Sequence, residues 1–108
     1  MTQPMIVTTT PTVEGRPVSE YLRVVAGETV VGINVFKDIG AGIRNFVGGR
    51  SASYEGEVAQ GREQALAAMV DRAIELGAQG VVGVTFDYET PGQGGMLMII
   101  AAGTAVRF

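Results

Sequence analysis

Hydrophobic and polar residues follow regular patterns in the C-terminal half of the chain, and these patterns predict its main elements. Residues 52–76 repeat apolar side chains every three to four positions with charged residues between them, which predicts one long helix that ends at Gly77. Residues 81–90 alternate valine, phenylalanine and tyrosine with polar residues, and a Pro-Gly-rich turn then leads to the apolar run 96–106. These last two segments predict a β-hairpin.

The N-terminal half predicts further strands and a second, short helix. Residues 6–8 predict a short strand, and residues 18–33, rich in valine, predict one long strand or two consecutive ones with Gly27 as a bulge or bend. Residues 36–47 place apolar side chains at helical spacing, although two glycines weaken that helix. The expected fold is α+β: an antiparallel sheet of three to four strands packed with one long and one short helix.

The last strand is apolar on both faces, and this predicts that the chain associates with itself. One face carries Met96, Met98, Ile100 and Val106, and the other carries Leu97, Ile99, Ala101 and Ala105. One long helix covers only one face of such a sheet, so the second face needs another cover. We expect a second copy of the chain there, with burial contributing on the order of 10 kcal/mol per subunit before association costs. A monomer whose N-terminal segment folds over that face remains the alternative.

Composition narrows the class of protein. A length of 108 residues fits a single domain over 1–108, while 46% hydrophobic residues and a mean hydropathy of +0.26 are high for so small a chain. The formal net charge is −3 and the lone lysine has no basic neighbours, so nucleic acid is not an expected partner. The longest apolar run is too short to span a bilayer, and the N-terminus lacks the basic start of a signal peptide. We therefore expect a cytoplasmic protein with no membrane partner.

The absence of cysteine and histidine removes most familiar chemistry. Thiolate and imidazole metal sites, disulfides and a histidine-activated serine are all excluded. No dinucleotide fingerprint or P-loop is present, so no cofactor is expected. These exclusions favour a non-enzymatic module over an enzyme.

The segment before the long helix holds the strongest candidate ligand site. Backbone donors at a helix start, together with arginine, suit a small polar or anionic ligand. The candidate residues are Arg44, Gly49, Arg50, Ser51, Tyr54 and Glu55. The competing interpretation, which we favour on the residues alone, is a helix corner: glycine for the turn, serine for the cap, and arginine paired with glutamate.

A second candidate is a pair of carboxylates in the predicted hairpin. Asp87 and Glu89 lie two positions apart on a strand, and so on one face, where a third oxygen donor would complete a site for a hard cation. Solvated carboxylates near a turn are the more common case.

Four stretches of the chain resemble a known family. TTTPTVEGRPVSEY, VVAGETVVGINVFKDIGAGIRNFVGGRSASYEGE, LGAQGVVGVTFDYET and GGMLMIIAAGTAV, which lie between residues 8 and 106, are similar to the YbjQ-like family of small uncharacterised bacterial proteins. The resemblance implies a dodecin-like subunit assembled into a ring, a pentamer or a decamer, with no established activity. It also brings a heavy-metal-binding label, which suits poorly a chain without cysteine or histidine. The family's characteristic patch corresponds here to Gly42, Ile43, Arg44, Gly48, Gly49, Arg50, Ser51, Tyr54 and Glu55.

Three functions follow as hypotheses. The first is a homo-oligomeric structural or ligand-binding module whose pockets between subunits are lined by Arg44, Arg50 and Tyr54. The second is a metal-binding protein that uses Asp87 and Glu89 from several subunits. The third is an enzyme that uses these carboxylates with arginine as electrostatic stabiliser.

Overall fold

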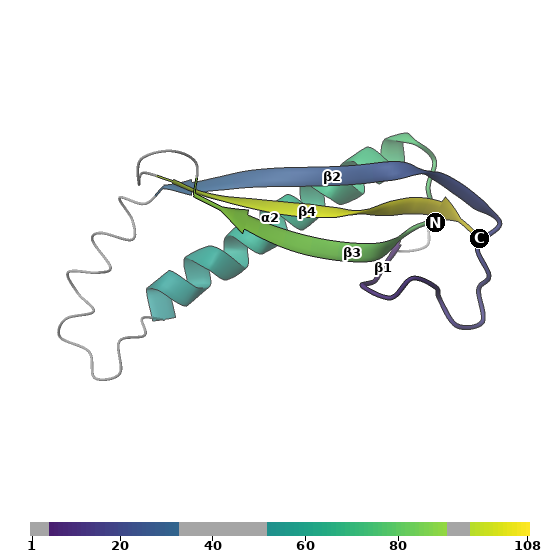
Figure 1. Ribbon diagram of the computed structural model, residues 1–108, viewed down its shortest axis with the longest axis horizontal. Coiled ribbons are helices and arrows are strands. Elements are labelled where there is room, and N and C mark those ends of the chain that lie inside the picture. The colour runs from purple at the N-terminus through teal and green to yellow at the C-terminus, as the bar shows by residue number, and fades with distance from the viewer. Residues whose placement is uncertain (1–4, 33–51, 91–95) are drawn as a thin grey trace.

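The computed structural model describes residues 5–32, 52–90 and 96–108, and the side chains of the helix from residue 56 onward. Four strands and one helix make up this part of the chain (Figure 1). In chain order they are β1 (Ile6–Val7), β2 (Glu20–Gly32), α2 (Ala52–Glu75), β3 (Gly80–Glu89) and β4 (Met96–Arg107). The long helix and the hairpin strands are thus confirmed to within one residue, whereas the short helix expected at 36–47 and the turn at 91–95 lie outside the described residues.

The four strands form one curled sheet in the order β1-β3-β4-β2. β4 pairs antiparallel with both β3 and β2, as the hairpin prediction requires. β1 instead pairs parallel with β3, so the expectation of a purely antiparallel sheet is wrong. The reason is the connection between β1 and β2, which crosses one end of the sheet and allows β1 to run in the same direction as its neighbour.

β2 is one continuous strand, and Gly27 is not a bulge. The register with β4 shifts between Tyr21 and Arg23, and from there to Gly32 every residue has a partner in order, including Gly27 opposite Ala101. Glycine stands at position 27 for a different reason. A Cβ there would lie 2.2 Å from the backbone oxygen of Ala65, in the middle of the helix. Gly27 therefore lets the helix approach the strand backbone directly.

The strict alternation expected along β3 breaks at Gly83. This residue has φ of 63°, and the register with β4 shifts between Val82 and Thr85. As a result Val81 and Val84 both belong to the core beneath the helix, whereas Val82 does not. The expectation that Val82 and Val84 share a face was wrong, because a left-handed glycine resets which residues point to which side.

α2 covers one face of the sheet and supplies the centre of the core. In Figure 1 the helix lies behind the strands and crosses them obliquely. Ala65, Met69 and Ala73 are fully buried against Val81, Ile99 and other strand residues. The helix ends at Gly77, whose φ is 78°, with Gly77 N–H bonded to the Ile74 carbonyl at 2.9 Å and Ala78 N–H to the Ala73 carbonyl at 3.1 Å. These two bonds are the Schellman motif predicted by a terminal glycine.

The face of the sheet turned away from α2 is here named the open face. Paired residues on neighbouring strands share a face, so the open face follows from the register. It includes Val24, Ala26, Glu28 and Val30 of β2, Met96, Met98 and Ile100 of β4, and Asp87 and Glu89 of β3. The division of β4 into two apolar faces is confirmed, since Leu97, Ile99, Ala101 and Ala105 pack in the core beneath the helix.

The chain itself covers only one end of the open face. Val82 and Val106 are buried at that end, where the Phe108 ring lies against Gly80 and the Arg16 guanidinium stacks 4.4 Å from the centre of that ring. Further along, side chains of the open face remain exposed to water, among them Val24 by 70%, Val30 by 48% and Met96 by 47%. Met96, expected in the core, is therefore not a core residue within the described chain.

Candidate functional site

The residues proposed for the polar or anionic ligand cannot be placed against one another. Arg44, Gly49, Arg50 and Ser51 lie outside the described residues, and Tyr54 and Glu55 belong to the first turns of α2, where only the backbone is described. The ligand site in this segment therefore stays a prediction.

The two carboxylates proposed for a cation lie where the strand pattern put them. Asp87 and Glu89 are exposed on the open face of β3. Their cross-strand partners on β4 are Ile100 and Met98, and Glu28 lies beyond Ile100 on the far side of β4. Within residues 5–32, 52–90 and 96–108, no three acidic side chains come close enough to share an ion. One copy thus offers two carboxylates among apolar neighbours and no third ligand.

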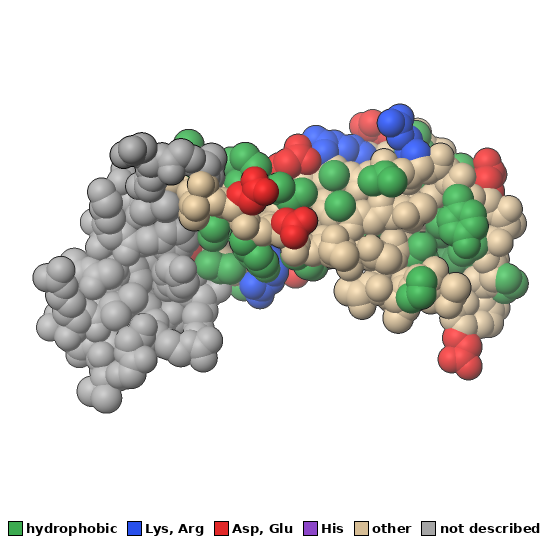
Figure 2. Space-filling model, viewed as in Figure 1, with side chains coloured by type: hydrophobic (Ala, Val, Ile, Leu, Met, Phe, Trp, Pro, Cys, Tyr) green, Lys and Arg blue, Asp and Glu red, His purple; other side chains and the backbone are tan. Residues whose placement is uncertain are grey.

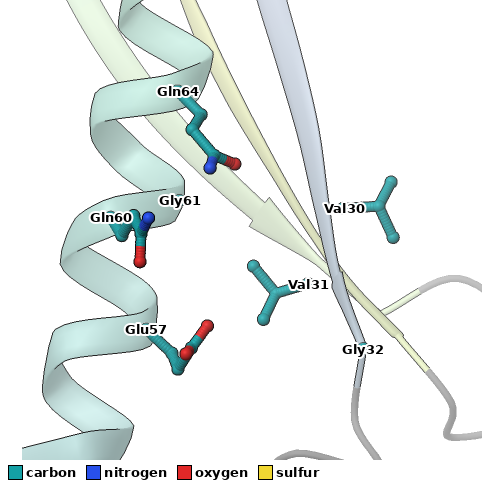
Figure 3. A pocket seen from close by; sticks show the side chains of 7 residues that line it. All are labelled: Val30, Val31, Gly32, Glu57, Gln60, Gly61 and Gln64. Atoms are coloured by element: carbon teal, nitrogen blue, oxygen red, sulfur yellow. The ribbon is translucent and has the colours of Figure 1, made fainter.

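A polar groove of about 220 Å³ lies beside the first half of α2 (Figure 3). Its lining residues come from the end of β2 and from three turns of the helix: Val30, Val31, Gly32, Glu57, Gln60, Gly61 and Gln64. Figure 3 shows Val31, Glu57 and Gln64 pointing into the space between helix and strand. The Thr29 hydroxyl donates to the Gln64 side-chain oxygen at 3.0 Å, which fixes that amide. The groove offers amides and a carboxylate but no positive charge, so it does not suit an anion.

A second groove, of about 300 Å³, lies between the edge of β2 and the C-terminal half of α2. It is named the Arg23–Arg72 groove after its two cationic side chains, and it is lined by Arg23, Val24, Val25, Ala26, Arg72, Glu75 and Leu76. Arg72 donates to Glu28 through both guanidinium nitrogens, at 3.0 and 3.5 Å, and also to the Ala26 backbone oxygen. Arg72 is therefore already partly neutralised, whereas Arg23 stands on the other side of the groove.

Sequence reasoning missed the Arg23–Arg72 groove. Its two arginines are far apart in the chain and share no motif, and only the packing of α2 against β2 brings them to one groove. The helical pattern places Arg72 on the polar side of the helix but says nothing about which strand it faces. The one usable signal was the exposed apolar content of the helix end, where Ile74 and Leu76 are 57% and 40% exposed and not buried as the helical stripe predicted.

Charged side chains are unevenly distributed around the sheet. Figure 2 shows Lys and Arg side chains along the margin formed by β2 and the end of α2, and Asp and Glu side chains set among hydrophobic ones over the middle of the sheet. Among the helices that the structure describes, none has the length and apolar character needed to cross a membrane.

Comparisons with known proteins place the chain in a family. Residues 5–108 match the family YbjQ_1, described as "Putative heavy-metal-binding". A UPF0145 protein of Corynebacterium jeikeium is 66% identical over 104 residues, covering 96% of this chain and 99% of the relative, and one of Clostridium botulinum is 53% identical over 105 residues, covering 96% and 99%.

A crystal structure from Pediococcus pentosaceus has the same fold. Described as a DUF74-family protein of unknown function, it superposes with a TM-score of 0.66 at 18% identity, covering 98% of this chain and 99% of its own. The match over nearly the whole length, together with the curated relatives, shows that this chain belongs to the YbjQ-like (UPF0145) family.

Proposed function

We propose that this protein is a self-associating module in which copies of the chain cover one another's open faces. The observation that carries the proposal is the exposure of Val24, Val30 and Met96 on the face opposite the helix. Isolated exposed apolar side chains are ordinary, but these three lie on one sheet face with Met98 and Ile100, which are only partly buried.

The energetics favour association without making it strong. Full burial of a valine or methionine side chain contributes about 1.5–3 kcal/mol, so three side chains roughly half exposed contribute about 3 kcal/mol per copy. That is less than the sequence suggested, because one end of the face is covered by Phe108 and its neighbours. Association costs at least about 4 kcal/mol, so the open face needs further contacts to hold copies together. A closed ring, in which every copy has two neighbours, doubles the contacts per copy.

Native mass spectrometry of protein purified without chelators tests the proposal and reports any retained ligand mass. The expected result is one closed oligomer, of which a pentamer or decamer is the ring that we propose. Val24→Lys should dissociate it, because a charge would enter the covered face. Ile74→Lys, at an equally exposed apolar position on the helix, should not. A monomer at micromolar concentration, or equal dissociation by both variants, would contradict this arrangement.

A hard cation at the joined faces is the second candidate. Asp87 and Glu89 lie on the same face as the apolar residues, so association would bring carboxylates of several copies together. The family description names heavy metals, but a chain without cysteine or histidine offers oxygen ligands, which suit Mg²⁺, Ca²⁺ or Mn²⁺. Elemental analysis should then find metal that Asp87→Asn loses and Glu63→Gln retains. No stoichiometric metal, and no thermal shift with these ions, would remove this candidate.

A further inference from the structure

The two flanks of the sheet carry opposite charge next to exposed apolar side chains. On the β2 flank, the Arg23–Arg72 groove is bordered by Val24, 70% exposed, and Leu76, 40% exposed. β2 is the edge strand of the sheet, so the groove opens sideways, away from the other strands. It presents two guanidinium groups beside an apolar surface.

The opposite flank presents carboxylates. β1 pairs with β3 only at Gly80 and Val81, and the residues after β1 continue the backbone hydrogen bonds as far as Val84. In the described sheet, the outer edge of β3 beyond that point has no neighbouring strand. There Asp87, Tyr88 and Glu89 are all exposed, with Tyr88 at 47%. This acidic end of β3 combines two carboxylates with an aromatic ring.

We propose that the Arg23–Arg72 groove of one copy receives the acidic end of β3 from a second copy. The inference rests on the proposed self-association and specifies which surfaces meet. Guanidinium and carboxylate groups attract, and Val24, Leu76 and Tyr88 lose water together when the two surfaces close. The contact supplies the further interactions that the open face alone lacks.

The contact is head to tail. Each copy has one groove and one acidic end, on opposite flanks of its sheet, so each copy binds one neighbour through each flank. Repeated by a rotation that closes, this arrangement gives a ring. Pairing of like surfaces is disfavoured, because groove against groove would bring arginines together and acidic end against acidic end would bring carboxylates together.

Two details of the groove shape the contact. Arg72 already binds Glu28, so Arg23 contributes more of the attraction for an incoming carboxylate. Arg72 also donates to the Ala26 backbone oxygen, which occupies the edge of β2 at that point. The contact is therefore made by side chains, and the sheets of the two copies do not continue into one another there.

A charge-reversal cycle tests the contact. Arg23→Glu and Asp87→Lys should each raise the apparent dissociation constant about tenfold or more, measured by sedimentation velocity over a concentration series, because each places like charges in the contact. The double variant Arg23→Glu/Asp87→Lys restores attraction with the signs exchanged and should return to within about threefold of the wild type. Arg62→Glu and Glu63→Lys, on the helix outside both surfaces, are the matched controls and should leave assembly unchanged.

The outcomes separate this inference from the proposed function. Both substituted residues are exposed, so circular dichroism should show unchanged folding, and Arg23→Ala with Asp87→Asn, which weaken the contact less, repeat the cycle without reversed charge. If both single variants assemble as the wild type does while Val24→Lys dissociates, the head-to-tail contact is wrong and self-association stands. A double variant that dissociates more than either single one also overturns the contact. A monomeric wild type overturns both.

Discussion

Replacing Gly27 by alanine should destabilise the protein more than any other glycine-to-alanine change in β2. The added Cβ would lie 2.2 Å from the Ala65 backbone oxygen, 2.4 Å from the Met69 backbone nitrogen and 2.9 Å from the Ala68 Cβ. Two of these atoms belong to the backbone of α2 and cannot rotate away. Either the helix or the strand must move.

The size of the effect follows from that movement. Ordinary contact begins at 3.4 Å, so the helix and strand must separate by about 1 Å at their crossing point. Met69 and Ala65, both fully buried, sit at that crossing and lose contact with the strands. Overpacking of this kind costs about 1–3 kcal/mol, and loosened neighbours add to it, while the stiffer unfolded chain returns less than about 1 kcal/mol. We expect a net loss of about 3 kcal/mol.

Urea unfolding at one fixed protein concentration measures this loss, since self-association would make the midpoint depend on concentration. Gly32→Ala is the matched control: it lies in the same strand, and an added Cβ meets nothing within 4 Å. Its free energy of unfolding should equal or slightly exceed that of the wild type. If Gly27→Ala unfolds within about 0.5 kcal/mol of Gly32→Ala, the close approach of helix and strand is not what requires glycine.

Three further changes follow from the same packing. Met69→Ala should lower the free energy of unfolding by about 2–5 kcal/mol in urea titration, since the side chain is fully buried, and a loss below 1 kcal/mol would mean that it is not central to the core. Gly83→Ala should cost about 1 kcal/mol and Gly83→Asn less, because φ is 63° although the space around it is open; equal stability of all three by thermal melting would show that the bulge relaxes. Arg72→Ala should cost less than about 1 kcal/mol, since its ion pair with Glu28 is half exposed, and a larger loss in a thermal melt would reveal that the bond to the edge of β2 matters more than the charge.

The elements with a strong internal rhythm were predictable. α2 has both a helical repeat and a glycine stop, and β4 carries apolar side chains on both faces, so their bounds and faces followed from sequence. Local pattern could not give the direction of β1, because Ile6 pairs with Gly80, a residue remote in the chain. It also misjudged both special glycines: a glycine in a strand signals a bulge or a close approach, and only the packing of α2 decides that Gly27 is the second and Gly83 the first.

The candidate site was predictable only in part. Asp87 and Glu89 share a face because strand residues two apart always do, and the register confirms it. Ile74 and Leu76 fit the apolar side of the helix by spacing, yet both are exposed because the helix extends past the region where the strands lie beneath it. The Arg23–Arg72 groove depends on how the helix crosses the sheet, which no residue spacing encodes.

The pairing of β2 with β4 has a consequence for how the chain comes to be folded on the ribosome. β2 emerges early, but in the described sheet its strand neighbour is β4, and more than half of the chain lies between Gly32 and Met96, which pair. Until β4 is synthesised, the valines of β2 have no strand to join, and contacts this distant in sequence form slowly. Nascent chains stalled before residue 96 should therefore expose a sticky segment to chaperones, and release of β4 should withdraw it.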